Sequence, residues 1–302
     1  MNTPAENAAP EQQPQPRLYA LSSLLGDFRA DATAAHEART SGKPRGPITG
    51  IASLDRELSG ALTPGVHGIH GNAGAGKTAF AWQVAASCQC PALFVTCEMG
   101  PVELLRRLTA RATSTYLGRL KSGEMTPAEA EARAREAIES APQLHMVDAT
   151  IAAASPQYLL QAASIVRGDS KHFLLVVDSL HSWAGALSST APGASEYETL
   201  NAGVAALQSM AAKLQAPVLF VAERNRDSMK SGGLNAGAGT RKIEYAGETV
   251  ISLDRDTDAR EDGGGEVPVK LKFAKNRNGA AGRTVDLLFH GALQRFREAK
   301  AQ

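Results

Sequence analysis

Eight consecutive residues in the first third of the chain have the types and spacing of a phosphate-binding loop. Residues 71–78 fit the pattern G-x-x-x-x-G-K-[ST], between a short run that can form a strand (66–70) and a run with helical periodicity (79–86). Small residues let consecutive backbone N–H groups and the positive end of the following helix face triphosphate oxygens. We therefore expect a nucleoside triphosphate to be bound by Gly71, Asn72, Ala73, Gly74, Ala75, Gly76, Lys77 and Thr78.

Two side chains of the loop and one distant aspartate predict a magnesium site. Lys77 would reach the β- and γ-phosphates, and the Thr78 hydroxyl would hold Mg²⁺. Asp178 follows four consecutive Leu and Val residues, as does the acid of the second nucleotide-binding motif, which holds Mg²⁺ directly or through water. The alternative for Asp178 is a solvated aspartate at a strand end.

Two glutamates also follow apolar runs that predict buried strands. Glu98 ends the run 92–97, where a carboxylate can orient and deprotonate an attacking water. Its alternative is a carboxylate favoured by the dipole at a helix N-terminus. Glu223 ends the run 217–222 and could contact the γ-phosphate or a coupling water; an ion pair with Arg224 or Arg226 is an equal alternative.

The rest of the chain must position these side chains. Alternating apolar strands and helical runs over residues 48–302 predict an α/β domain, with a mainly parallel sheet flanked by helices. In such a sheet the active site lies at the carboxyl ends of the strands. The last two predicted strands, 283–289 and 293–296, form a hairpin, and Thr126 with Glu129 predicts a capping box at a helix start.

Two segments precede this domain. Residues 1–16 are rich in Pro, Gln, Asn and Ala and predict a disordered tail. Residues 17–47 predict an amphipathic helix, from Leu18 to Ala35, and a polar connector. The apolar stripe of this helix could cover its own domain or a neighbouring subunit.

The composition argues against a protein with a basic surface throughout and against a membrane-spanning protein. The chain has 302 residues and a formal net charge of +1, which argues against a basic coat for nucleic acid over the whole surface. Its three cysteines, Cys88, Cys90 and Cys97, predict buried small apolar side chains. No apolar run approaches the ~20 residues of a membrane span, and we expect a cytoplasmic protein without membrane contact.

Taken together, the motifs resemble the ATPase domain of DnaB-like replicative helicases, a branch of the hexameric RecA-like motors. The resemblance extends from Leu18 to Phe296 but does not include the family's N-terminal collar domain. It implies a RecA-like P-loop NTPase fold with an N-terminal linker helix and a C-terminal β-hairpin. Besides the phosphate loop, the matching segments are Thr49-Gly50-Ile51, Leu54-Asp55-Arg56, Cys97-Glu98-Met99, Glu103-Leu104, Val177-Asp178-Ser179-Leu180, Ala216-Pro217-Val218, Asn225-Arg226, Ile243-Glu244 and Lys275-Asn276-Arg277-Asn278-Gly279.

The resemblance also implies roles for single residues. Glu98 matches the catalytic glutamate, and Asp178 matches the magnesium-motif aspartate. Lys275 and Arg277 match a basic pair that reaches the nucleotide of the neighbouring subunit; without the family they would predict a solvated basic turn. The helix from Leu18 matches a linker helix that docks on the adjacent protomer of a homohexameric ring. Glu223 matches the position that senses the γ-phosphate, where the family has glutamine instead of glutamate.

Nucleic acid is a further implied partner. Two loops of these motors face a central channel, and here they would be residues 182–195 and 227–240. Residues 224–242 carry a surplus of four positive charges, which suits contact with single-stranded DNA phosphates; a solvated flexible loop is the alternative. The candidate contacts are Arg226, Lys230, Arg241 and Lys242.

The leading functional prediction is a magnesium-dependent ATPase that works as a helicase-type ring motor on single-stranded DNA in replication, recombination or repair. The alternatives are an ATP-switched assembly protein and a recombinase-like filament protein without helicase activity. DNA-stimulated turnover separates the motor from the switch.

Overall fold

The structure is a computed structural model that describes residues 18–188, 193–223, 247–255 and 265–299. The predicted tail, residues 1–16, lies outside these ranges, and so do the candidate DNA contacts Arg226, Lys230, Arg241 and Lys242. The chain divides into two compact units, residues 1–45 and 46–302.

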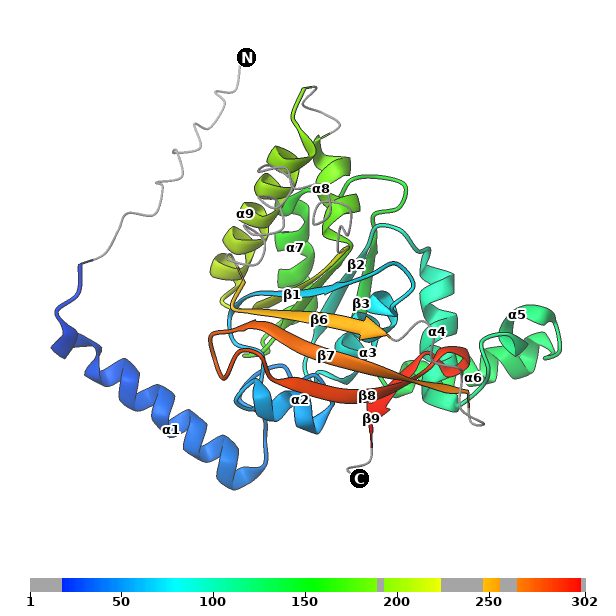
Figure 1. The fold of residues 1–302 in the computed structure, drawn as a ribbon, viewed down its shortest axis with the longest axis horizontal. Coiled ribbons are helices and arrows are strands. Elements are labelled where there is room, and N and C mark those ends of the chain that lie inside the picture. The colour runs from blue at the N-terminus through cyan, green and yellow to red at the C-terminus, as the bar shows by residue number, and fades with distance from the viewer. Residues whose placement is uncertain (1–17, 189–192, 224–246, 256–264, 300–302) are drawn as a thin grey trace, which may run out of the picture. The chain divides into compact units, whose positions relative to one another are not determined.

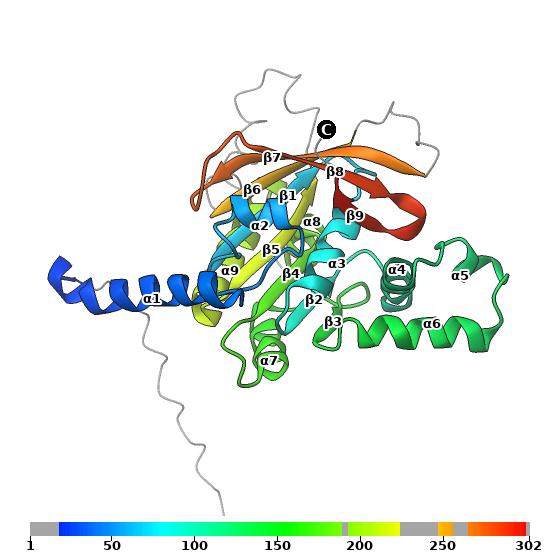
Figure 2. The same cartoon turned by 90° about the horizontal axis from the view of Figure 1, so that it is seen from below.

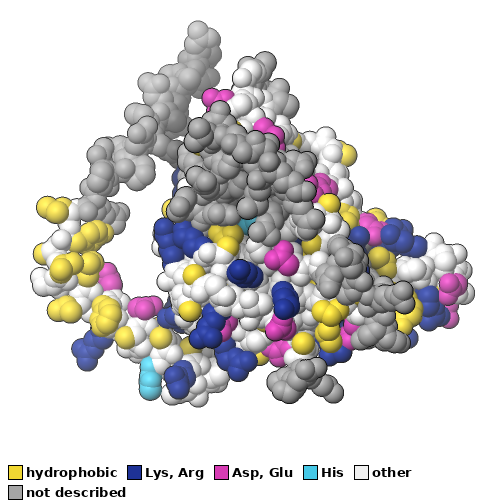
Figure 3. All heavy atoms as spheres, in the orientation of Figure 1, with side chains coloured by type: hydrophobic (Ala, Val, Ile, Leu, Met, Phe, Trp, Pro, Cys, Tyr) yellow, Lys and Arg dark blue, Asp and Glu magenta, His cyan; other side chains and the backbone are white. Residues whose placement is uncertain are grey.

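The N-terminal unit is a helix with an uncovered apolar side. A 3₁₀ turn, η1 (Leu21–Leu24), leads into α1 (Leu25–Ser41), so the helix begins later and ends later than predicted. Gly42 follows with φ of +70°, a left-handed conformation that suits glycine at a helix end. Within this unit the side chains of Leu21, Leu25 and Phe28 are largely exposed. Hydrophobic side chains are visible on the surface of this unit in the space-filling view (Figure 3).

The larger unit is built on a sheet whose described strands are ordered β3-β2-β4-β5-β1-β6-β7-β8-β9 (Figure 1). The first six strands in this order pair in parallel, and β7, β8 and β9 add antiparallel neighbours. The strands are β1 (Gly65–Gly71), β2 (Ala92–Thr96), β3 (Leu144–Asp148), β4 (Leu174–Asp178), β5 (Pro217–Glu223), β6 (Thr249–Arg255), β7 (Glu266–Asn276), β8 (Thr284–His290) and β9 (Arg295–Glu298).

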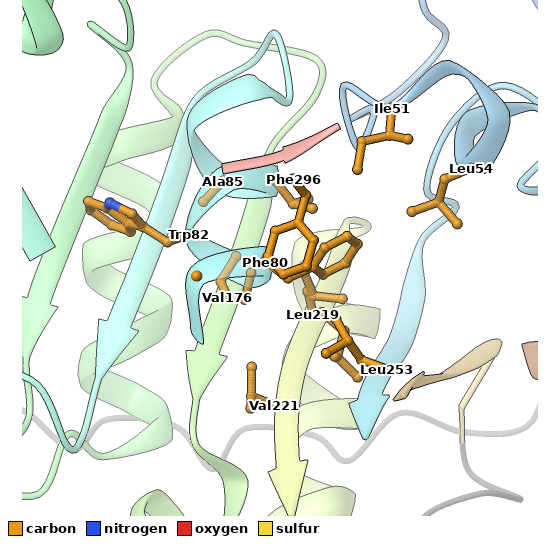
Figure 4. Packing of buried hydrophobic residues seen from close by; sticks show 14 of the residues in the cluster. Ile51, Leu54, Phe80, Trp82, Ala85, Val176, Leu219, Val221, Leu253 and Phe296 are labelled. Atoms are coloured by element: carbon orange, nitrogen blue, oxygen red, sulfur yellow. The ribbon is translucent and has the colours of Figure 1, made fainter. Parts of the chain in front are cut away.

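Helices cover both faces of the parallel part of the sheet (Figures 1 and 2). Phe80 of the helix that follows the phosphate loop packs on one face near Val176 and Leu219 (Figure 4). Trp82 of the same helix contacts Phe94 of β2, with ring centroids 4.8 Å apart. On the opposite face a second core contains Trp183 and Leu207. The first face carries α2 (Ala52–Glu57), α3 (Lys77–Ser87), α4 (Pro101–Thr113) and α6 (Pro127–Glu139), and the second carries α7 (Pro156–Arg167), α8 (Leu180–Ser188) and α9 (Glu196–Leu214); α5 (Arg119–Ser122) is a short helix between α4 and α6.

Burial explains the two kinds of strand. Every residue of β4 is buried, as expected for a strand with helices on both sides. In β7 the buried residues Val269, Leu271 and Phe273 alternate with exposed neighbours, so this strand has one covered face. The prediction of a mainly parallel sheet with a C-terminal hairpin is confirmed, and the predicted capping box of Thr126 and Glu129 is present.

One predicted loop is wrong in its first half. Residues 182–188 belong to α8 rather than to a loop, because Trp183 is fully buried and its indole N–H donates to the carbonyl of Ala154 (2.8 Å). Residues 193–195 precede α9, and 189–192 lie outside the described ranges. The cysteines are free thiols, with Cys88 and Cys90 buried and Cys97 half-buried.

Over the described ranges, none of the helices combines the length and the apolar character that a membrane crossing requires.

Candidate active site

The phosphate loop connects β1 to α3 at the carboxyl ends of the parallel strands. Glycine is required at two of its positions. A Cβ at Gly71 would lie 2.7 Å from the carbonyl oxygen of Leu253, and Gly76 has φ of +95° directly before α3. Larger residues would therefore displace the loop from β6 or distort the start of the helix.

Lys77 is the buried cation of this loop. Its side chain is 9% exposed, and Nζ donates to the carbonyls of Gly71 (3.0 Å) and Asn72 (2.9 Å). Burial lowers the pKa of Lys77, while the charges of Glu223, Asp178 and Glu98 act to raise it. The ammonium thus lies among carbonyl and carboxylate oxygens, where the phosphates of a nucleotide would offer it further acceptors.

Asp178 and Thr78 meet beside Lys77. Asp178 is 4% exposed at the end of β4, and it accepts a hydrogen bond from the Thr78 hydroxyl. Burial raises the pKa of Asp178 to about 6, and the neighbouring charge of Glu98 adds to the shift. A buried carboxylate beside a hydroxyl fits a hard divalent cation, because oxygen ligands are those that Mg²⁺ prefers and its charge would favour the ionised form.

Glu98 lies on the neighbouring strand's end, next to Asp178. Thr96, the last residue of β2, is opposite Asp178 in the register, which brings the following Glu98 to the same edge. The hydroxyls of Ser179 and Ser182 both donate to Glu98 Oε1, at 2.5 and 2.6 Å. Burial opposes ionisation, but these hydrogen bonds and the charge of Lys77 outweigh it, so the pKa of Glu98 is lowered. Glu98 is therefore an ionised carboxylate whose position is fixed by two serine hydroxyls.

Glu223 approaches Lys77 from β5, which lies between β4 and β1 in the sheet. It ends β5 opposite Gly71 of β1, and its Oε1 is 3.9 Å from Lys77 Nζ, with 63% of the side chain exposed. Its predicted alternative partners, Arg224 and Arg226, lie outside the described ranges. The structure thus brings Lys77, Thr78, Glu98, Asp178 and Glu223 to one edge of the sheet.

These side chains line a cavity of about 410 Å³ together with residues that the sequence motifs did not indicate. Arg107 of α4 reaches it and donates to Gln294 Oε1 (2.5 Å). At another part of the lining, the guanidinium of Arg255 lies 6.0 Å from the centroid of the Phe289 ring. Arg107 occurs one helical turn after Glu103 in a helix that follows Glu98, which is a weak signal; Arg255 and Phe289 carry no motif.

Lys275 and Arg277 lie at the opposite end of the strands. They flank Asn276, which is opposite Thr249, and Thr249 is opposite His67 of β1. His67 precedes Gly71 by four residues, so the basic pair is separated from the phosphate loop by roughly 13 Å along the strand, at ~3.3 Å per residue. Neither residue lines the cavity of its own chain.

The fold and the cavity define a P-loop ATPase. The family model of the DnaB-like helicase C terminal domain matches residues 46–298. The chain therefore belongs to the family of DnaB-like helicase C-terminal domains.

Individual relatives agree with this family. Over 261 residues the chain is 27% identical to the replicative DNA helicase DnaB of Treponema pallidum (strain Nichols), covering 83% of this chain and 56% of that protein. The chain thus spans little more than half the length of that relative.

Solved structures show the same fold. One solved ATPase domain aligns with a TM-score of 0.73 at 19% identity, covering 90% of this chain and 98% of that one. A DnaB-like replicative helicase studied with primase aligns with a TM-score of 0.71 at 19% identity, covering 90% of this chain and 66% of that one.

Proposed function

We propose that the protein is a magnesium-dependent ATPase that works as a helicase-type ring motor on single-stranded DNA. The observation that carries this proposal is the division of the site between two ends of the sheet. Lys77, Glu98 and Asp178 surround one cavity, whereas Lys275 and Arg277 lie at the far end of the same strands. A complete site then needs the basic pair of a neighbouring subunit, as a ring provides for every subunit.

Within one subunit, the residues divide the work of hydrolysis. The loop N–H groups and Lys77 bind the phosphates, and Glu98 orients the attacking water and accepts its proton. Thr78 and Asp178 would hold Mg²⁺, which neutralises charge on the β- and γ-phosphates when bound. Arg255 and Phe289 offer a cationic and aromatic surface on which the base of ATP can stack.

Across the interface, Arg277 and Lys275 would contact the γ-phosphate of the neighbouring subunit. Negative charge spreads over the γ-phosphoryl oxygens in the transition state, and a guanidinium delivered in trans is worth roughly 10³–10⁵ in rate. The exposed apolar side chains of Leu21, Leu25 and Phe28 support a second contact, in which α1 packs on the adjacent protomer.

Single-stranded DNA is the proposed substrate of the motor, in replication, recombination or repair, with a cytoplasmic location where that DNA is found. Support comes from the family and from the positive surplus of residues 224–242. Binding of this kind depends on phosphate contacts and weakens with salt.

The test is steady-state ATP hydrolysis with and without a single-stranded oligonucleotide at low and moderate salt, with Glu98→Gln as the blank. The motor predicts stimulation that declines as salt rises. An unchanged rate, with ATP still altering the oligomeric size, would replace the motor by an ATP-switched assembly protein; a helical filament in place of a ring would favour the recombinase-like alternative.

A further inference from the structure

A carboxylate lies beside the basic pair at the end remote from the nucleotide cavity. Glu248 Oε1 accepts a hydrogen bond from Arg277 Nη1 at 2.9 Å. The charge of Glu248 also acts to raise the pKa of Lys275, although burial and Arg277 outweigh it and the pKa is lowered. Glu248 therefore interacts with both members of the pair.

Glu248 is itself fixed in place by its backbone. Its N–H donates to the carbonyl of Val66 at the start of β1 (2.7 Å), and its carbonyl accepts from the N–H of Arg277 (2.9 Å). One residue thus ties the beginning of β1 to the end of β7. The positions of the carboxylate and of the Arg277 backbone are set by the same two strands.

Gly65, the first residue of β1, provides the space that the Glu248 side chain occupies. A Cβ built on Gly65 would lie 2.5 Å from Glu248 Cγ, so any larger residue there would displace this side chain. Gly65 has φ of +136°, which other residues rarely adopt. The Glu248 side chain is consequently 26% exposed, whereas its partner Arg277 remains 55% exposed.

Glu248 holds one nitrogen of the Arg277 guanidinium, while more than half of the Arg277 side chain stays exposed to solvent. Arg277 Nη1 bonds to Glu248, while a planar guanidinium carries five N–H donors in a fixed fork. An arginine held in this way loses less rotamer freedom when it meets an anion, because its orientation is set beforehand.

We propose that Glu248 is a positioning residue, which holds the Arg277 guanidinium in the orientation that it presents to the γ-phosphate of the neighbouring subunit. Glu248 would touch no nucleotide and would act through Arg277. This inference rests on the proposed function, because it requires that Arg277 completes the site of an adjacent protomer.

The test is the variant Glu248→Gln in the full chain, with ATP turnover measured under conditions in which oligomers form. The amide keeps the size of the side chain but removes its charge, and exposed ion pairs contribute little energy. We therefore expect kcat to fall about three- to tenfold with the KM for ATP unchanged. Glu131→Gln, which breaks the exposed pair of Glu131 with Arg135 on α6, should leave both constants at their original values.

A second variant separates positioning from a general structural role. In an Arg277→Lys background the fork is absent, so Glu248→Gln should change kcat by less than twofold. An equal fall of kcat in both backgrounds, or a matching fall in the melting temperature, would overturn the inference.

The failure of this inference is distinguishable from that of the proposed function. Wild-type kcat for Glu248→Gln, together with an inactive Arg277→Ala, would refute the positioning role and leave the shared site intact. Full turnover by Arg277→Ala would refute the shared site and the positioning role with it.

Discussion

The charged side chains at the two ends of the parallel strands differ in burial. At the carboxyl end, Lys77 and Asp178 are almost completely buried and hydrogen-bonded to loop carbonyls and to Thr78. At the amino end, Arg277 is more than half exposed and pairs with Glu248 at the surface. Burial at the carboxyl end removes favourable hydration from Lys77 and Asp178, whereas Arg277 at the amino end remains hydrated.

The difference indicates which part of the chemistry one chain can complete. Buried charges shift pKa values and act strongly on a bound phosphate, because little water screens them. An exposed arginine gains comparable strength only when a second surface removes the water around it. The carboxyl end is thus prepared within one subunit, whereas the amino end depends on assembly for its effect.

The largest expected effect is the loss of turnover in Arg277→Ala. Removal of a guanidinium supplied in trans should lower kcat by roughly 10³–10⁵. Binding of ATP should persist, because the cavity of each subunit is lined without Arg277. Rapid-quench hydrolysis and equilibrium nucleotide binding on the same preparation measure the two properties.

Subunit mixing is the control for the position of Arg277. Arg277→Ala and Glu98→Gln subunits are each expected to be inactive, but a mixed ring contains interfaces with an intact Glu98 and an intact Arg277. Such interfaces should recover part of the activity after subunit exchange. Recovery that never exceeds either parent, although exchange is demonstrated, would contradict the comparison between the two ends.

The sequence allowed the carboxyl end to be predicted better than the amino end. The loop motif indicated Lys77 and Thr78, and Glu98 and Asp178 each end an apolar run. All of these segments must meet at the same edge of a parallel sheet. The structure brings these four together. Their chemical roles remain predictions.

Other features depend on contacts that no local pattern records. Glu248 meets Arg277 through the register of β6 and β7, and Arg255 meets Phe289 across strands that are not neighbours in sequence. Residues 182–188 form part of α8 instead of the predicted loop, and Trp183 of this helix is buried with its indole N–H donating to the carbonyl of Ala154. Such pairings follow from tertiary register, which hydrophobic periodicity does not specify.

A smaller effect is expected when Glu223 becomes glutamine. Glu223, Glu98 and Asp178 surround Lys77, and a triphosphate adds further negative charge at the same place. Glu223→Gln removes one repulsive charge at an exposed position, so the Kd for ATP should fall about three- to tenfold at low salt. Fluorescent-nucleotide titration at two salt concentrations measures the change, with Glu131→Gln as the charge-matched control. Weaker binding by the variant would show that the carboxylate has a favourable role of its own.

The smallest expected effect concerns the stability of the nucleotide-free protein. Burial raises the pKa of Asp178 from the ordinary 3.8 to about 6, so its carboxyl takes up a proton on folding within this window. The folded state therefore binds more protons there, and its stability decreases as pH rises from about 4 to 6. Asp178→Asn removes that penalty, and in EDTA it should raise the melting temperature by on the order of 2–4 °C at pH 7.5.

At pH 5 the stabilisation by the same variant should be about half of that at pH 7.5, because pH 5 lies about midway between the ordinary pKa of 3.8 and the raised pKa of about 6. Asp286→Asn, at an exposed position of β8, should show little change at either pH. The same test compares the two ends of the sheet, since Arg277→Ala removes a charge that is already in water and should shift melting by less than Asp178→Asn does at pH 7.5. A stabilisation of Asp178→Asn that is equal at both pH values would show that packing rather than buried charge separates the variant from the wild type.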